Sequence, residues 1–247
     1  MRYSSRFFLY APITAFLVLA LWAMGAWWVT ARAVEKTLDR INHHQAMPGI
    51  TISYGARSLS GFPFNIDLVF DDFSIRGQGA HGPFAWHSEH FAIHRLMLGR
   101  RQDLYEAAGR QSLSFTAAGG RSQRLDFLPG SLRASAILDS KGLARFDLET
   151  VAAAAEGFRA ADLQLHLRRD PDGDGIDLYA IGDGLTGSTL TQHFAVSEEL
   201  LRADPLRPLL AGQSAWPDAV KQWKAQGGAA KLVSGTPQEA ALLSVFH

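Results

Sequence analysis

The chain has 247 residues, 24 basic and 24 acidic side chains, a formal net charge of +0 and no cysteine. The lack of cysteine excludes disulfides, thiol catalysis and zinc–thiolate sites. The basic residues are scattered and balanced by acids, which gives no basis for nucleic-acid binding. Beyond the N-terminal apolar segment, about 200 residues remain, enough for one sizeable core or two small ones.

The first predicted element is a membrane-spanning helix over residues 7–31. Residues 7–29 carry no charge, and a helix that crosses a bilayer needs about 20 apolar residues. The run ends in Trp27 and Trp28, and tryptophan is enriched at membrane–water interfaces. The flanking cations are Arg2, Arg6, Arg32 and Lys36. We therefore expect the lipid bilayer to be a partner of this segment.

A cleaved secretory signal is the alternative, because Ala31-Arg32-Ala33 fits a small-x-small cleavage site. The apolar run is longer than the core of about 7–15 residues typical of a signal, which favours an uncleaved anchor. Lys and Arg counts in the flanks, together with the short N-terminus, place residues 1–6 in the cytoplasm. The expected location is a bacterial inner membrane, crossed once, with the C-terminal domain in the periplasm.

Residues 32–47 are expected to extend the helix beyond the membrane. Val34, Leu38 and Ile41 recur at spacings of four and three, which is a helical stripe. The Met47-Pro48-Gly49 sequence is then expected to end the helix.

From Ile50 the apolar period changes from 3.6 to 2, which predicts an antiparallel β domain over residues 48–182. In the clearest strand every second residue is apolar, and these side chains are expected to face inward, namely Phe62, Phe64, Ile66, Leu68 and Phe70. Further strands are expected over residues 84–98, 112–116, 123–128, 131–138, 143–150, 161–167 and 176–180. Polar turns at short spacing favour a meander over βαβ units.

The C-terminal region, residues 183–247, is expected to be more helical. Helices are predicted over residues 197–210, 217–226 and 236–246, the last opening with a Thr-Pro-Gln-Glu capping box. Four consecutive alanines leave residues 151–158 as either helix or loosely packed strand. The predicted fold class is mainly β with helices (α+β).

The Ser60-Gly61-Phe62-Pro63-Phe64 segment, preceded by an anchor and followed by an amphipathic strand and Trp86, carries a resemblance. It resembles the bacterial membrane-anchored envelope family catalogued as domain of unknown function 2125. Trp223 with Gly227-Gly228 resembles a second element of that family. The resemblance implies no catalytic or binding role, and it implies further strands beyond Gly228. From the residues alone, Gly61, Phe62, Pro63 and Phe64 form a turn and strand start, with a contact to lipid or a partner as the alternative.

One loop offers a weak calcium candidate in Asp170, Asp172 and Asp174. Carboxylates at positions 1, 3 and 5 with Gly at position 6 match the first half of an EF-hand. Position 12 is Ile181 instead of a bidentate glutamate, and strands rather than helices flank the loop. Asp-Gly is also a strong turn signal, so a plain hairpin loop is favoured.

His87, His90 and His94 would converge on a metal only if they lay on a helix. On the strand predicted here, His90 and His94 lie about 13 Å apart and His87 faces the other way. No Gly-x-Ser-x-Gly elbow, Gly-x-Gly-x-x-Gly loop or Walker loop occurs. No metal, cofactor or catalytic residue is therefore predicted.

Three functions stay open for this sequence. The first is a non-enzymatic, membrane-tethered envelope protein with a structural or interaction role and a lipid or an envelope protein as its partner. The alternative is a carrier or sensor of an apolar ligand, since a sheet with one aromatic face can curl around lipid as easily as around its own helices. The third is an enzyme of unidentified class. An apolar groove left open on the inner face would favour the alternative.

Overall fold

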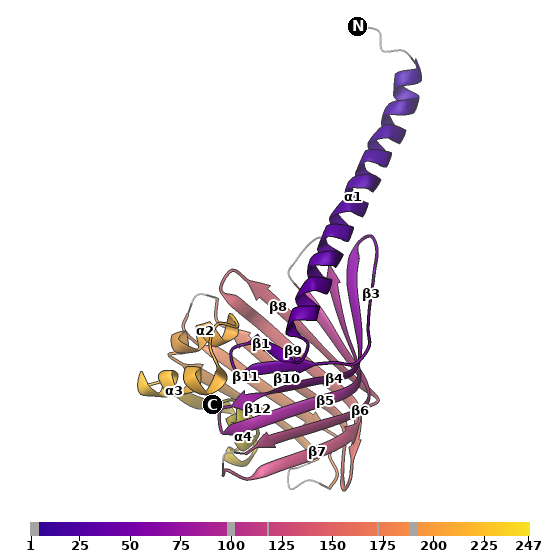
Figure 1. Ribbon diagram of the computed structural model, residues 1–247. Coiled ribbons are helices and arrows are strands. Elements are labelled where there is room, and N and C mark those ends of the chain that lie inside the picture. Colours follow the sequence, from indigo (N-terminus) through magenta and orange to yellow (C-terminus); the bar gives the residue numbers. More distant parts are fainter. Residues whose placement is uncertain (1–4, 98–101, 118, 172, 188–191) are drawn as a thin grey trace.

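The computed structural model describes residues 5–97, 102–117, 119–171, 173–187 and 192–247, and shows one long helix leading into a large antiparallel sheet (Figure 1). The helix α1 (Ser5–Ile41) has 37 residues and contains Pro12 near its start. Most of its length projects away from the sheet (Figure 1). The predicted class, mainly β with an N-terminal apolar helix and C-terminal helices, is confirmed.

Thirteen strands form the sheet over the described residues, and their pairings are antiparallel. The order is β1-β2-β4-β5-β6-β7-β9-β10-β11-β12-β13, with β3 on β4, and β8 between β6 and β9. The bounds are β1 (His44–Met47), β2 (Ile50–Ser53), β3 (Arg57–Ser60), β4 (Asn65–Gly79), β5 (Gly82–Leu96), β6 (Gln102–Thr116), β7 (Ser122–Leu128), β8 (Ser131–Asp139), β9 (Gly142–Ala155), β10 (Phe158–Arg169), β11 (Ile176–Asp183), β12 (His193–Leu201) and β13 (Ala229–Ser234).

A line of backbone irregularities crosses the sheet. Asp72 on β4, Gly109 on β6 and Ala152 on β9 all have left-handed φ angles, of 53°, 75° and 54°. Irregular residues of this kind bend a strand and increase its twist. On one side of the line β6 pairs with β8, and on the other side it pairs with β7. The sheet folds over, and β9–β12 lie behind β4–β7 (Figure 1).

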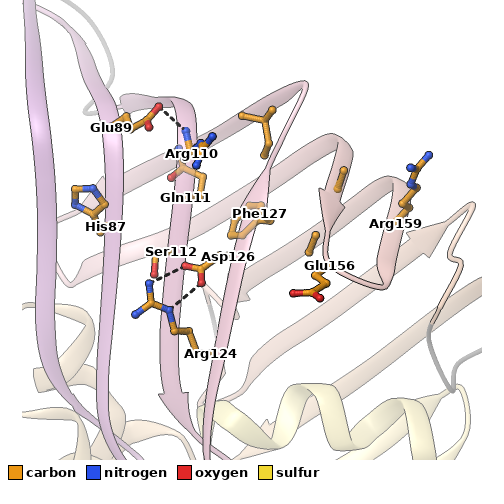
Figure 2. Close-up of a pocket in the computed structure, with 13 residues that line it drawn as sticks. His87, Glu89, Arg110, Gln111, Ser112, Arg124, Asp126, Phe127, Glu156 and Arg159 are labelled. Carbon is orange, nitrogen blue, oxygen red and sulfur yellow. Dashed lines mark hydrogen bonds and ion pairs between the residues drawn. The ribbon is translucent and has the colours of Figure 1, made fainter.

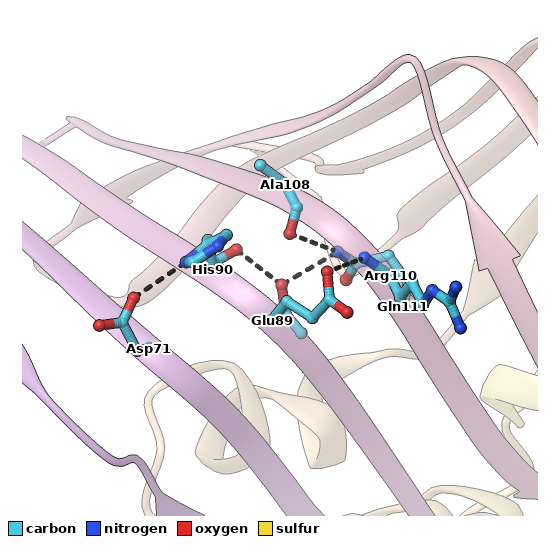
Figure 3. A network of polar contacts seen from close by, with 7 residues as sticks. Asp71, Glu89, His90, Ala108, Arg110 and Gln111 are labelled. Atoms are coloured by element: carbon cyan, nitrogen blue, oxygen red, sulfur yellow. Dashed lines mark hydrogen bonds and ion pairs between the residues drawn. The ribbon is translucent and has the colours of Figure 1, made fainter.

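The irregularity between β5 and β6 is held by polar side chains, of which Ser88 and Gln111 are buried (Figure 3). Ser88 pairs with Gln111, and His90 pairs with Ala108, so Gly109 and Arg110 together lie opposite Glu89. The Gln111 amide donates to Ser88 Oγ at 3.0 Å, and the Arg110 backbone N–H donates to the Glu89 carboxylate at 2.8 Å. The Gln111 amide also donates to the Ala108 and Gly109 carbonyls at 3.2 Å, so backbone groups at the bulge are paired by side chains.

The core has two parts. The first lies where α1 meets β4, β5 and β6, and centres on the fully buried Phe70. The second lies where β10, β11 and β12 meet the C-terminal helices η1 (Asp204–Leu206), α2 (Arg207–Leu210), α3 (Trp216–Ala225), α4 (Pro237–Leu243) and η2 (Ser244–Phe246).

Trp223 of α3 anchors the second core. Its side chain is 1 % exposed, and its indole N–H donates to the Leu201 carbonyl at 2.9 Å. A Cβ on Gly228 would lie 2.1 Å from the indole nitrogen, so the close approach requires glycine. Helix α4 opens with the predicted capping box of Thr236 and Glu239, which is confirmed. One further strand, β13, follows Gly228.

Several predicted boundaries were wrong. The juxtamembrane helix expected over residues 32–47 ends at Ile41, because residues 44–47 pair with β2 across a tight turn at Pro48 and Gly49. The helix predicted over residues 197–210 is strand β12 up to Leu201 and short helical turns after it. The sheet therefore extends past residue 182. Residues 151–155 are strand, the second of the two alternatives.

The inward orientation predicted for Phe62 and Phe64 was also wrong. Ile66, Leu68 and Phe70 are buried as expected, but Phe62 and Phe64 are 54 % and 63 % exposed. The physical reason is that β4 begins only at Asn65, whose backbone N–H donates to the Gly61 carbonyl at 2.8 Å. The turn closed by this bond directs both rings outward.

Candidate binding groove

One face of the sheet is apolar from β4 to β12, and the strand register shows how it is assembled. Phe91 pairs with Ala107, and Ala107 with Leu132, so these side chains share the face. Tyr105 pairs with Ala134, and Ala134 in turn with Leu148. Because paired residues of neighbouring strands point to the same side, the alternation along each strand adds up to a continuous apolar surface.

The two ends of this face are covered and its middle is not. Ala31 and Leu38 of α1 pack on the β4 end, and Trp223 and Leu243 pack on the β11–β12 end. Between them lies a cavity of about 440 Å³. Its wall is formed by apolar and aromatic side chains of β4 to β9, namely Ile75, Trp86, Phe91, Tyr105, Ala107, Leu113, Phe127, Leu132, Ala134, Phe146 and Leu148. We call this cavity the groove.

The groove wall is only partly shielded from solvent. Phe127, Phe146 and Leu148 are half-buried, whereas Phe91 and Leu132, which line the same wall, are buried. These half-exposed aromatic and aliphatic side chains lie together in a concave surface. Covering such a surface with an apolar partner is favourable, because it removes apolar area from water.

A small polar group contacts the groove residue Tyr105, whose hydroxyl donates to the Asp103 carboxylate at 3.4 Å. The Arg95 guanidinium donates to the Asp103 carboxylate, with 2.5 Å between Arg95 Nε and Asp103 Oδ1. Burial, reinforced by the charge of Asp103, raises the pKa of Tyr105 to about 12. The phenol therefore stays protonated and uncharged at physiological pH. Glu106, Arg133 and Thr150 also line the groove. The Arg133 guanidinium donates to the Glu106 carboxylate at 2.9 Å, and the Thr150 hydroxyl donates to the Ser131 carbonyl at 3.1 Å, so these polar side chains already have partners within the protein.

A second, larger cavity of about 710 Å³ lies between β6, β7 and β9 (Figure 2). His87, Ser112 and Asp126 alternate with the groove residues of their strands and so point to the opposite face. Arginine and acidic side chains alternate around this cavity, from Arg110, Arg124 and Arg159 and from Glu89, Asp126 and Glu156.

The charges of this second cavity are balanced. Arg124 lies 2.9 Å from Asp126, and its hydrogen bond lowers the pKa of that carboxyl. Such exposed pairs contribute little energy. The cavity is open, and the sequence placed no nucleophile or paired acid and base there. We therefore assign it no chemistry.

The histidines of β5 are separated by their partners. Figure 3 shows His90 directed at Asp71, with 2.9 Å between the ring nitrogen and the carboxylate. His94 pairs in the same way with Asp67 at 2.8 Å, and His87 with Ser74 Oγ at 3.1 Å. Among the described residues, no three His, Asp or Glu side chains gather in a way that would hold a metal ion.

The loop proposed as a weak calcium candidate connects β10 to β11 as a hairpin. The Asp170 backbone N–H donates to the Gly175 carbonyl at 3.0 Å, and Arg169 pairs with Ile176. The Asp174 carbonyl accepts a bond from the Ala203 backbone N–H at 2.6 Å. Asp172 lies outside the described residues. The predicted hairpin is confirmed, and the absence of calcium binding stays a prediction.

The sequence alone does not reveal the groove wall. Residues 131–138 and 143–150 were predicted as strands with one apolar face, and that periodicity was the available signal. It marks which side chains share a face, but the same pattern describes a covered face and an open one. No motif marked Ala134, Phe146 or Leu148 as groove residues.

The fold and the groove define a class: a folded antiparallel sheet that carries a long apolar N-terminal helix and an open apolar cavity. The family described as uncharacterized protein conserved in bacteria (DUF2125) matches residues 27–239, and the chain belongs to this family. The predicted resemblance is therefore confirmed. Searches of curated proteins and of solved structures find no match.

Proposed function

We propose that this protein is a membrane-tethered, non-enzymatic envelope protein that holds the hydrocarbon chain of a lipid in its groove. The observation that carries the proposal is the uncovered middle of the apolar face, a cavity of about 440 Å³. This volume lies within the range of about 300–1,000 Å³ typical of small-molecule sites.

The chemistry of the wall selects the ligand class. Side chains such as Phe127, Phe146 and Leu148 offer contact area without hydrogen-bonding groups. Each methylene that moves from water into such a surface gains about 0.8 kcal/mol. A polar ligand would lose its hydrogen bonds to water without replacement, which costs free energy. A hydrocarbon chain is therefore the ligand that fits best.

The tether is the second half of the proposal. Over the described residues, α1 is the single helix long and apolar enough to cross a membrane. We place it in a bacterial inner membrane, with the N-terminus in the cytoplasm and the sheet in the periplasm. Family membership supports a bacterial source, and the Lys and Arg flanks support the orientation.

Binding of a fluorescent long-chain fatty acid to the purified full-length protein tests the proposal. Ala134→Trp fills the groove, whereas Ala154→Trp places the same ring on an exposed position of β9 as a matched control. We expect the groove variant to bind at least about tenfold more weakly, which corresponds to about 1.4 kcal/mol. Unlabelled lipid should compete in the wild type. Equal binding by the two variants would contradict the proposal.

A further inference from the structure

The last turns of α1 belong to the folded domain, whereas its earlier turns do not. Trp27, Ala31, Val34, Leu38 and Ile41 form one helical stripe packed against the first core. From Tyr10 to Ala26, a stretch that we call the bare part of α1, the large apolar side chains point into open space, and Phe16 and Trp22 are 71 % and 63 % exposed.

Together with the uncharged residues 7–9 that precede it, the bare part of α1 has the length of a bilayer core. Residues 7–26 are about 20 residues, and at about 1.5 Å per residue they span about 30 Å. If this part crosses the membrane, the surface of the membrane lies at Trp27 and Trp28. Arg32 stacks over the Trp28 ring, with 3.8 Å between the guanidinium carbon and the ring centroid, which suits the lipid phosphate level.

An exposed apolar tip of the domain lies at this same level. The tip consists of Phe62, Phe64 and Leu96, which are 54 %, 63 % and 59 % exposed. The Phe64 carbonyl accepts a bond from the Met97 backbone N–H at 2.8 Å, which brings the two segments together.

Trp27 fixes the tip beside the helix. Its ring lies 5.5 Å from the Phe62 ring, edge to face, and its indole N–H donates to the Asn65 carbonyl at 2.8 Å. The tip therefore cannot move away from the end of the bare helix without breaking both contacts.

We infer that Phe62, Phe64 and Leu96 form a second membrane contact, inserted into the lipid interface beside α1. The inference rests on the proposed tether. Aromatic side chains favour the interface, where the apolar ring is covered and nearby polar groups stay hydrated. A single membrane helix can tilt and carry the attached domain with it, whereas a second contact fixes the orientation of the domain over the bilayer. The partner is the phospholipid interface, and not a protein.

Because the chain has no cysteine, single cysteines can report on this contact. Full-length protein with Phe64→Cys carries a nitrobenzoxadiazole fluorophore and is reconstituted into phosphatidylcholine–phosphatidylglycerol vesicles. Some of the lipids bear a nitroxide quencher just below the headgroup. Leu19→Cys, on the bare part of α1, tests the tether, and Gln123→Cys, on exposed β7, tests the background.

We expect the fluorophore at position 64 to be quenched by the nitroxide lipid several-fold more than the one at position 123, and to be protected from aqueous iodide. Lipid quenching with quenchers deeper in the bilayer at position 19, but only background quenching at position 64, would overturn the second contact and leave the tether intact. Water access at position 19 would overturn the tether, and with it this inference.

Discussion

Trp27 of the long helix and Phe62 of the loop before β4 meet edge to face, with 5.5 Å between ring centroids and 87° between ring planes. This contact joins the apolar helix to the sheet domain at a defined height. Trp27 also binds the backbone of Asn65. The helix therefore continues into the first core as a structural element.

Because Phe70 is buried and Phe64 is exposed, replacing them with alanine should affect the stability of the protein very differently. Phe70 is 1 % exposed and touches Tyr54, Phe73 and Phe91, so Phe70→Ala should lower the free energy of unfolding by about 3–5 kcal/mol. Phe64→Ala, at a 63 % exposed position, should change it by less than about 1 kcal/mol. Urea unfolding followed by tryptophan fluorescence measures both. Similar losses for the two variants would place Phe64 in the core.

The ion pair of Asp139 with Arg169 predicts an acid-dependent contribution to stability. Arg169 is 8 % exposed and donates to the Asp139 carboxylate and to the Lys141 carbonyl, and the bond from Arg169 lowers the pKa of Asp139. Asp139→Asn should lower the free energy of unfolding by up to about 1 kcal/mol at neutral pH, because Arg169 loses its charged partner but the pair is partly exposed to solvent.

The sign of the pH dependence follows from the lowered pKa. The contribution of the ion pair to the free energy of unfolding is complete above the pKa of Asp139 in the unfolded state, about 3.9. It disappears as pH falls through the lower pKa of Asp139 in the folded state. The difference in unfolding free energy between wild type and Asp139→Asn should thus be constant from pH 5 to 7, as a rough window, and shrink in stronger acid. A difference that grows on acidification would refute the assignment.

The loop of residues 170–175 should not bind calcium usefully. It is a hairpin connection without a bidentate glutamate, and even extracellular sites with complete loops reach only about 10⁻⁴–10⁻³ M. We expect no rise in melting temperature at sub-millimolar calcium, since stabilisation follows RT ln(1 + [L]/Kd). A clear rise that Asp172→Asn abolishes would establish a calcium site.

The proposed topology predicts where a reporter is active. Alkaline phosphatase fused after His247 should be active, because it folds only after export, whereas a green fluorescent protein fused there and exported unfolded should stay dark. With the reporters fused after Arg6 instead, alkaline phosphatase should be inactive and green fluorescent protein should fluoresce. Activity of the C-terminal reporter only in the cytoplasm would reverse the orientation.

Much of the architecture could be predicted because alternation is a local signal. The period of two in residues 66–70 and 161–167 marks strands wherever they pair. The direction of the turn side chains was harder to predict. Phe62 and Phe64 continue the apolar alternation of the strand, although the backbone turns before Asn65. A hydrogen bond across a turn decides that direction, and periodicity does not record it.

The groove could not be predicted for a different reason. Whether Phe146 and Leu148 face an open cavity depends on where α1 and α3 dock, far away in sequence. The bend that folds the sheet depends on the left-handed residues Asp72 and Ala152, and neither is a glycine. The groove therefore arises from tertiary packing, and no single strand carries a sequence pattern that predicts it.

Mass spectrometry of the gently purified full-length protein tests the central claim most directly. Wild-type protein should release a lipid with a long hydrocarbon chain in near-stoichiometric amount after extensive washing in detergent. Ala134→Trp, whose ring occupies the groove, should release far less, and Ala154→Trp should match the wild type. Equal amounts from all three proteins, or none from the wild type, would contradict the account.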